Sequence, residues 1–236
     1  MCTRIVSRGN DVINGFNFDI DLAVWNHQVM KEKDRFYIGI QMPDGQYHSY
    51  HGINRNGNIG TLLYVHGNDN AKYDGKTESY TIADLVENYI YGNISFDEAV
   101  QIVKTKKITY ADGATMQGML SAKNGRVLII EPGIGFRIEN SPNTYSLITN
   151  YSLLDPESTK AFITPGDNRY ERAKNMLNRY KGKTSIENMW EVLKAVHQEG
   201  LWATRVSFVY SEREHTVYYT ENNNFEKIEK YHFPPK

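Results

Sequence analysis

The order of strand-like and helix-like segments restricts the fold of this 236-residue sequence more than any other feature. Runs of β-branched and aromatic residues bounded by turn residues predict strands, and apolar spacing with a helical period predicts helices. The expected strands lie at residues 3–6, 34–40, 47–53, 58–66, 115–122, 126–131, 135–139, 145–149, 204–210, 215–220 and 225–231, and the expected helices at residues 81–90, 95–106, 168–180 and 185–197. Because strand blocks alternate with helix pairs, we expect an α+β fold with two antiparallel sheets and the helices outside them.

Turn and cap residues support this division. Thr81 suits the N-cap of the first helix, and Ser95 with a glutamate three residues later forms a capping box at the second. The Asn14-Gly15 step is typical of a tight hairpin turn. We find no internal repeat and no linker, so we expect a single domain over residues 1–236.

Composition and motif content exclude several classes of function. The formal net charge is −1 and the basic residues are scattered, which disfavours nucleic acid binding. One cysteine excludes an internal disulfide and a multi-cysteine zinc site. The histidines lack metal-ligand spacing and no phosphate-binding loop is present, so we expect neither a metal nor a cofactor. Without a signal-peptide pattern or a membrane-span apolar run, we expect a cytoplasmic protein with no membrane partner.

The single cysteine, Cys2, directly follows the start methionine. Removal of Met1, which aminopeptidases carry out before small residues, places a thiol and a free α-amine on one residue. The ordinary pKa of an α-amine is about 7.7–8.0 and that of a cysteine thiol about 8.5. The amine can therefore take the thiol proton and later deliver it to a leaving amine. Cys2 is a candidate N-terminal nucleophile, although a cysteine at this position is also compatible with no role at all.

Two further residues suit this chemistry. Asp19 offers a carboxylate that can hold the new α-ammonium, and Asn150 follows a predicted strand and can offer its side-chain NH₂ to an oxyanion. In known enzymes, removing one such donor costs about 3–4 kcal/mol of transition-state stabilisation. Taken alone, Asp19 also fits a solvated turn and Asn150 a turn former.

In this order, the elements resemble the choloylglycine hydrolase family, which includes penicillin V acylases and bile salt hydrolases and is related to acid ceramidase-type amidases. The resemblance rests on Met1-Cys2-Thr3, Gly15-x-Asn17-x-Asp19, Thr149-Asn150, Arg169-Tyr170-x-Arg172-Ala173 and Val217-Tyr218-Tyr219-Thr220-x-Asn222. It implies a four-layer αββα N-terminal nucleophile hydrolase fold and hydrolysis of a linear amide.

The resemblance also implies roles for individual residues. Cys2 would be the nucleophile, its α-amine the base, and Asp19 the group that orients this amine. Asn150 would supply one oxyanion donor. The second donor is a backbone N–H, which counting onward from the Gly-x-Asn-x-x-Gly turn at residues 52–57 places near Tyr64.

The sequence departs from the family where two arginines are expected. Phe16 occupies the position between the glycine and the asparagine of the early element, and Thr220 follows the paired tyrosines. Arg169 is the best candidate to replace these arginines, ahead of Arg4 and Arg205. An apolar Phe16 at the pocket rim favours substrate binding through an uncharged or fatty acyl chain.

We therefore expect a cysteine amidase that cleaves a small N-acyl amide through a thioester. An acyltransferase with the same chemistry fits the sequence equally well. The absent arginines favour a third alternative, a non-catalytic descendant that binds a small molecule. A homo-oligomer is compatible with the sequence.

Overall fold

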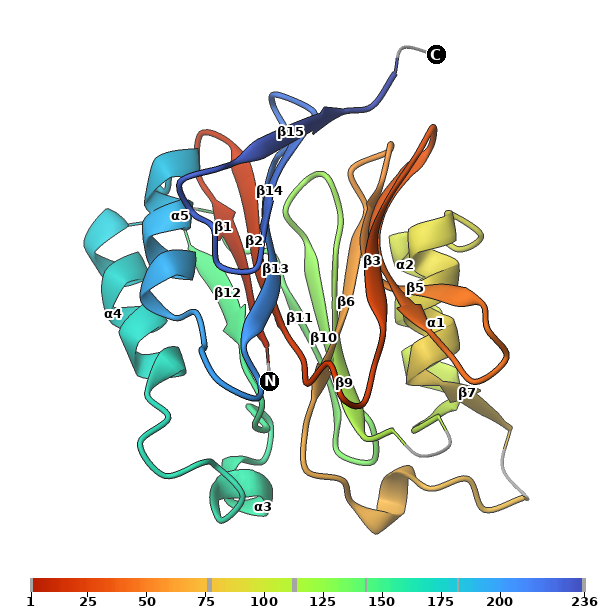
Figure 1. The fold of residues 1–236 in the computed structure, drawn as a ribbon. Coiled ribbons are helices and arrows are strands. Elements are labelled where there is room, and N and C mark those ends of the chain that lie inside the picture. The colour runs from red at the N-terminus through yellow and green to blue at the C-terminus, as the bar shows by residue number, and fades with distance from the viewer. Residues whose placement is uncertain (1, 76–77, 112–113, 143, 182, 235–236) are drawn as a thin grey trace.

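The computed structural model describes residues 2–75, 78–111, 114–142, 144–181 and 183–234; Met1 lies outside them. Within these residues, two large antiparallel sheets face each other, and a pair of helices covers the outer face of each (Figure 1). This α–β–β–α order of layers confirms the fold class expected from the sequence.

The first sheet contains the beginning of the chain. Its spatial order is β12 (Tyr145–Ile148), β1 (Thr3–Arg8), β2 (Val12–Asp19), β13 (Thr204–Ser211), β14 (Thr216–Glu221) and β15 (Glu229–His232). Helices α4 (Arg169–Tyr180) and α5 (Ile186–Ala195) pack on its outer face. The first strand of the chain is therefore internal, with a strand on either side of it.

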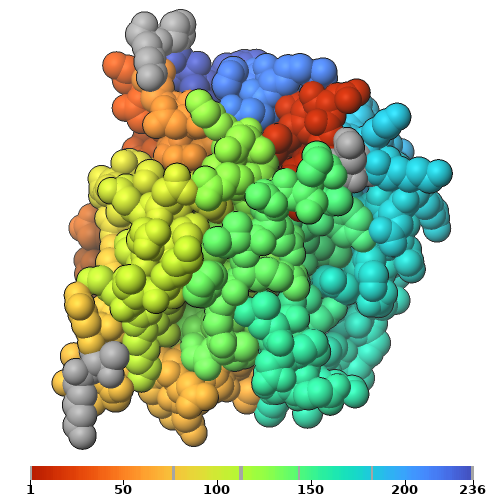
Figure 2. All heavy atoms as spheres, turned by 180° about the vertical axis from the view of Figure 1, so that it is seen from behind, coloured from red at the N-terminus to blue at the C-terminus, as the bar shows by residue number. Residues whose placement is uncertain are grey.

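The second sheet is built mainly from the first half of the chain. Its spatial order is β11 (Gly135–Glu139), β10 (Val127–Glu131), β9 (Met116–Ser121), β6 (Ile59–Tyr64), β5 (Tyr47–Asn54), β4 (Arg35–Gln41) and β3 (His27–Glu32). Helices α1 (Ile82–Tyr91) and α2 (Phe96–Thr105) belong to its outer layer. From behind, the green middle of the chain fills the surface between the yellow and the cyan helical regions (Figure 2). None of the described helices is long and apolar enough to cross a membrane.

Apolar side chains fill the space between the sheets and beneath each helix pair. The inter-sheet core includes Phe16, Phe36 and Phe208, all fully buried. Under α5, Met189 and Leu193 are fully buried against the first sheet, as the apolar spacing of the helix expected at residues 185–197 requires. Since each sheet is covered on both faces, its strands carry long buried runs instead of a simple inside–outside alternation.

The predicted helix starts are confirmed in detail. The side chain of Thr81 accepts a hydrogen bond from the Asp84 N–H, and Ser95 and Glu98 form the expected capping box. Several short elements escaped prediction: the edge strand β3, the parallel pair β7 (Ser79–Thr81) and β8 (Lys107–Thr109), the 3-10 turn η1 (Asp69–Ala71) and helix α3 (Pro156–Lys160). The last predicted strand, at residues 225–231, is shorter, because β15 begins only at Glu229.

The hairpin turn expected at Asn14-Gly15 is wrong. Both residues lie inside β2, and the chain reverses at residues 9–11, where the Gly9 N–H donates to the Asp11 carbonyl at 3.0 Å. Gly15 serves packing instead, because a Cβ there would lie 2.5 Å from the sulfur of Met189. The glycine thus lets helix α5 approach the sheet closely.

Candidate active site

The candidate site lies where strands of the first sheet begin and end. β1 runs antiparallel to both β2 and β12, so its start adjoins the ends of these two neighbours. Cys2 directly precedes β1, Asp19 is the last residue of β2, and Asn150 follows β12 by two residues. The sheet register therefore brings together three residues that are far apart in the sequence.

Cys2 is buried and contacts both partners. Its backbone N–H donates to Asn150 Oδ1 at 2.6 Å, and its Sγ lies 3.8 Å from the Asp19 carbonyl oxygen. Burial raises the pKa of the Cys2 thiol to about 11. The thiol is therefore neutral near pH 7, and nucleophilic attack by its sulfur requires a base that removes the proton.

Arg169 joins these residues from the start of helix α4. Its Nη1 lies 3.2 Å from the Cys2 carbonyl oxygen and 3.3 Å from Asp19 Oδ2, while Nη2 lies 3.1 Å from Asn150 Oδ1. Asp167 holds the other edge of the guanidinium, at 3.0 Å from Nε and 2.7 Å from Nη2. Among the arginines considered from the sequence, Arg169 thus contacts Cys2, Asp19 and Asn150 together.

The Asp19 carboxylate is enclosed by hydrogen-bond donors. Oδ1 accepts from the Thr204 hydroxyl at 2.6 Å, and Oδ2 accepts from Gln198 Nε2 at 2.7 Å as well as from Arg169. Burial raises the pKa of Asp19 to about 6, although Arg169 and the hydrogen bonds oppose this rise. Thr204 and Gln198 were not identified from the sequence. The only signal for Thr204 is its place opposite Asp19 in the pairing of β13 with β2.

Tyr64 and Asn150 meet across the gap between the sheets. Asn150 Nδ2 donates to the Tyr64 carbonyl at 2.6 Å, which leaves its second N–H for another acceptor. The next residue, Val65, donates its N–H to Thr115 on the β9 side. Backbone N–H groups alternate in direction along a strand, so the Tyr64 N–H leaves β6 on the opposite side. On that side β5 has already stopped pairing with β6.

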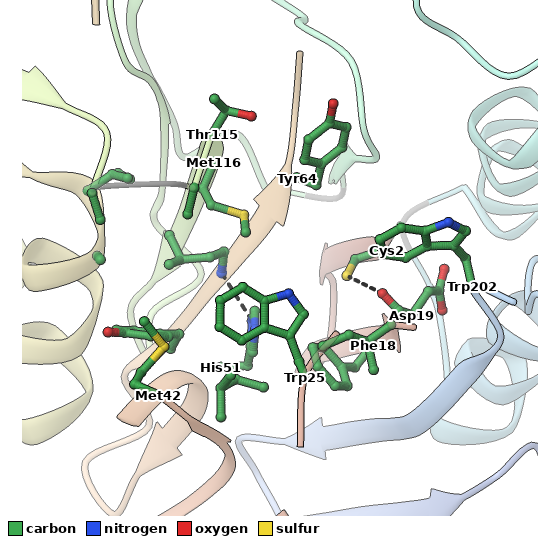
Figure 3. Close-up of a pocket in the computed structure, with 18 residues that line it drawn as sticks. Cys2, Phe18, Asp19, Trp25, Met42, His51, Tyr64, Thr115, Met116 and Trp202 are labelled. Atoms are coloured by element: carbon green, nitrogen blue, oxygen red, sulfur yellow. Dashed lines mark hydrogen bonds between the residues drawn. The ribbon is translucent and has the colours of Figure 1, made fainter. Parts of the chain in front are cut away.

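A largely apolar pocket of about 250 Å³ opens beside Cys2, whose sulfur points into it (Figure 3). Phe18, Trp25, Met42 and Met116 contribute to its walls, and Trp202 flanks Cys2. No lysine or arginine is found among the described lining residues. Such a wall suits an uncharged apolar group next to the thiol.

Comparison with known proteins identifies the architecture. No family model matches the sequence, and no curated protein matches it. Among solved structures, conjugated bile acid hydrolase from Clostridium perfringens superposes with a TM-score of 0.71 at 13% identity, covering 98% of this chain and 92% of that one. The chain has the N-terminal nucleophile hydrolase fold.

Two further N-terminal nucleophile hydrolases have the same fold. Penicillin V acylase from Agrobacterium tumefaciens gives a TM-score of 0.62 at 16% identity, covering 94% of this chain and 83% of that one. The Caenorhabditis elegans N-acylethanolamine-hydrolyzing acid amidase ortholog gives 0.60 at 16% identity, covering 89% and 93%. The resemblance inferred from sequence motifs is therefore confirmed at the level of the fold.

The remaining predicted residues of this N-terminal nucleophile hydrolase fold lie away from the thiol. Phe16 is fully buried and stacks on His51, so it supports the pocket wall from behind and does not lie at the rim, where we expected it. Arg4 is buried between the sheets, against Asn14 and Ser121. Arg205 donates to the Ile20 carbonyl, and Thr220 caps a turn through the Asn224 carbonyl.

Proposed function

We propose that the protein is a cysteine N-terminal nucleophile amidase that cleaves the linear amide of a small N-acyl substrate. The observation that carries this proposal is the convergence of Cys2, Asp19, Asn150 and Arg169 at the mouth of an apolar pocket. A structural role alone explains neither the buried thiol nor the asparagine that bridges it to Tyr64.

Acylation would begin at the thiol. With Cys2 as the first residue of the mature chain, its α-amine takes the Sγ proton and the thiolate attacks the amide carbonyl carbon. The carbonyl oxygen becomes negative, and the second Nδ2 hydrogen of Asn150 and the Tyr64 N–H stabilise it. Arg169 holds the Cys2 carbonyl oxygen and contacts Asp19, to which we assign the orientation of the freed α-amine.

The intermediate would then collapse and be hydrolysed. The α-ammonium delivers its proton to the leaving amine, the C–N bond breaks, and the acyl group remains on sulfur as a thioester. Water attacks the thioester carbonyl carbon and gives a proton to the α-amine. The C–S bond then breaks, the carboxylic acid leaves, and the α-ammonium returns its proton to Sγ, which restores the thiol. The amine is needed in both halves of the reaction, first to take the proton of the Cys2 thiol and then to take the proton of the attacking water.

The test is amine release from penicillin V, bile acid conjugates, N-acyl amino acids and fatty acyl amides. Wild-type protein, shown by mass to start at Cys2, should release amine, whereas Cys2→Ser should lose at least about 10³-fold in rate. Protein that retains Met1 should be inactive, because its Cys2 nitrogen is an amide. Full activity in Cys2→Ser, or no release from any substrate by mass-verified wild type, would contradict the proposal.

The same assay separates hydrolysis from acyl transfer. Added amines compete with water for the thioester in either case, but a transferase should form the new amide faster than it forms the free acid. We expect the free acid to dominate at millimolar amine concentrations, because the pocket walls are apolar and offer little to hold a second polar substrate.

A further inference from the structure

His51 is a polar group in the pocket that the proposed chemistry does not use. Its ring belongs to β5, is only 6% exposed and lines the same cavity as Cys2. The ring contacts both Phe16 and Phe18, with centroid distances of 5.3 Å and 4.9 Å. These aromatic contacts restrict the position of the imidazole.

The hydrogen bonding of His51 determines where its proton lies. The backbone N–H of Leu62 donates to Nδ1 at 3.2 Å (Figure 3), so Nδ1 carries a lone pair and the ring hydrogen sits on Nε2. Burial lowers the pKa of His51 to about 3. The imidazole is therefore a neutral N–H donor throughout the pH range in which the protein is expected to work.

Within the described part of the chain, no residue accepts a hydrogen bond from His51 Nε2, and this atom is not among the fully buried side-chain atoms that lack a partner. The Nε2 hydrogen is therefore open to the cavity that the ring lines. An occupant that displaces water from this donor without supplying an acceptor costs about 1–3 kcal/mol, so an occupant that supplies an acceptor is favoured. Since the described lining residues include no lysine or arginine, and the Asp19 carboxylate would repel an anion, a negatively charged acceptor finds no compensating charge among them.

We propose that His51 is a specificity-determining residue that donates from Nε2 to an uncharged oxygen on the acyl part of the substrate. The substrate class is then an N-acyl amide whose apolar acyl group carries a hydroxyl, ether or keto oxygen. This inference rests on the proposed amidase function, since it assigns the pocket beside Cys2 to the acyl group.

The test uses two substitutions at His51, each of which reproduces the hydrogen bonding of only one of the two ring nitrogens. Asparagine at position 51 places an acceptor near the position of Nδ1 and keeps the Leu62 bond, but it has no donor at the Nε2 position. Glutamine places a donor near the position of Nε2 but removes the acceptor of the Leu62 N–H. His51→Asn should therefore change selectivity, and His51→Gln should chiefly change stability.

The substrates are octanoyl amides of one fluorogenic amine, either plain or with a hydroxyl or keto group at successive carbons. In wild type, one oxygen position should raise kcat/KM about tenfold over the plain chain. His51→Asn should lose this preference, so that its kcat/KM is the same for oxygenated and plain chains, and His51→Gln should keep the preference. A wild type indifferent to oxygen at every position, or a preference that survives in His51→Asn, overturns the proposal.

A binding measurement keeps this test separate from that of the amidase function. In Cys2→Ser protein, the same amides should bind with the same oxygen preference, and the Nε2 proton of His51 should shift downfield by NMR when the oxygenated chain binds. Selective binding without turnover in wild type would refute the amidase function and leave the role of His51 standing. Equal binding of oxygenated and plain chains refutes the role of His51.

Discussion

The side-chain amide of Asn150 donates a 2.6 Å hydrogen bond to the backbone carbonyl of Tyr64. Asn150 follows a strand of the first sheet and Tyr64 ends a strand of the second, so this bond joins the sheets at the site. On its other side, Asn150 Oδ1 accepts from the Cys2 N–H and from Arg169. The asparagine is therefore oriented through both ends of its amide before any substrate binds.

Asn150→Ala should lower kcat/KM about 10²- to 10³-fold, because it removes an oxyanion donor. Asn150→Asp has nearly the same shape but places a carboxylate against the Tyr64 carbonyl, so its kcat/KM should fall at least as far as that of Asn150→Ala. Steady-state kinetics with the best substrate of the panel would measure both, with circular dichroism to show that each variant is folded. A loss of less than tenfold in the alanine variant would contradict the assigned role.

Arg169→Met should lower the free energy of unfolding by about 3–5 kcal/mol, because it leaves the buried Asp19 without its cation. Arg169→Lys keeps the charge but cannot reach Cys2, Asn150 and Asp167 together, so we expect an intermediate loss. Urea unfolding measures the free energy of unfolding of each variant. The double variant with Asp19→Asn should lose less than the sum of the two single changes, and strict additivity would argue against direct coupling.

Below the range in which the α-amine becomes protonated (ordinary pKa about 7.7–8.0), the activity should show a second acid limb with an apparent pKa of about 6, because protonation of Asp19 removes the charge that faces Arg169. Thr204→Val removes a hydrogen bond that lowers the pKa of Asp19, so the acid limb should move to higher pH. Thr204→Ser keeps the hydroxyl and serves as the matched control. A pH–rate profile that does not shift in Thr204→Val would show that Asp19 does not govern this limb.

The same carboxyl group should make stability depend on pH. The pKa of Asp19 is about 6 in the folded protein and ordinarily 3.8, so the folded state binds more protons between these values. Its contribution is therefore most favourable below pH 4 and is lost as the pH rises through 6. The free energy of unfolding of wild type, minus that of Asp19→Asn, should fall by about 3 kcal/mol over this range. A difference that rises with pH would mean that folding lowers the pKa of Asp19 instead of raising it.

Gly15→Ala should destabilise the protein by about 1–3 kcal/mol, because the new Cβ would lie 2.5 Å from Met189 Sδ. Met189→Ala alone opens a cavity and also destabilises. In the double variant the added methyl has room, so the double variant should lose less stability than the sum of the losses in the two single variants. Thermal or urea unfolding of the three variants measures this coupling, and an additive result would show that Met189 moves aside freely.

Much of the fold was predictable because its local signals agree with its tertiary structure. The capping box at Ser95 and the apolar face of α5 specify helices without help from distant residues. The hairpin turn predicted at Asn14-Gly15 was wrong because a turn propensity acts locally, whereas the packing of Met189 against Gly15 depends on a helix more than 170 residues away. Strand β3 escaped because a partly exposed edge strand carries a weak hydrophobic pattern.

The residues of the candidate site likewise fall into those that the sequence could indicate and those that it could not. Cys2, Asp19 and Asn150 could be proposed from the sequence because their chemistry is distinctive, and the strands beside Cys2 and Asn150 were predicted, whereas β2, which ends at Asp19, was not. The contact of Thr204 with Asp19 depends on the pairing of β13 with β2, which joins residues 185 apart in the sequence, and Gln198 reaches Asp19 from the segment before β13. No local pattern specifies either contact. The position of Phe16 at the rim was predicted wrongly because strand periodicity does not reveal which sheet face borders a cavity.

The internal position of β1 has a consequence for biosynthesis. The strand that starts beside Cys2 is complete only when β12, at residues 145–148, has joined its free edge, and Cys2 is then buried. Until residue 148 has been synthesised, the sheet that buries Cys2 is incomplete. The only thiol of the protein should therefore stay accessible to oxidants and other modifying reagents during translation of more than half of the chain.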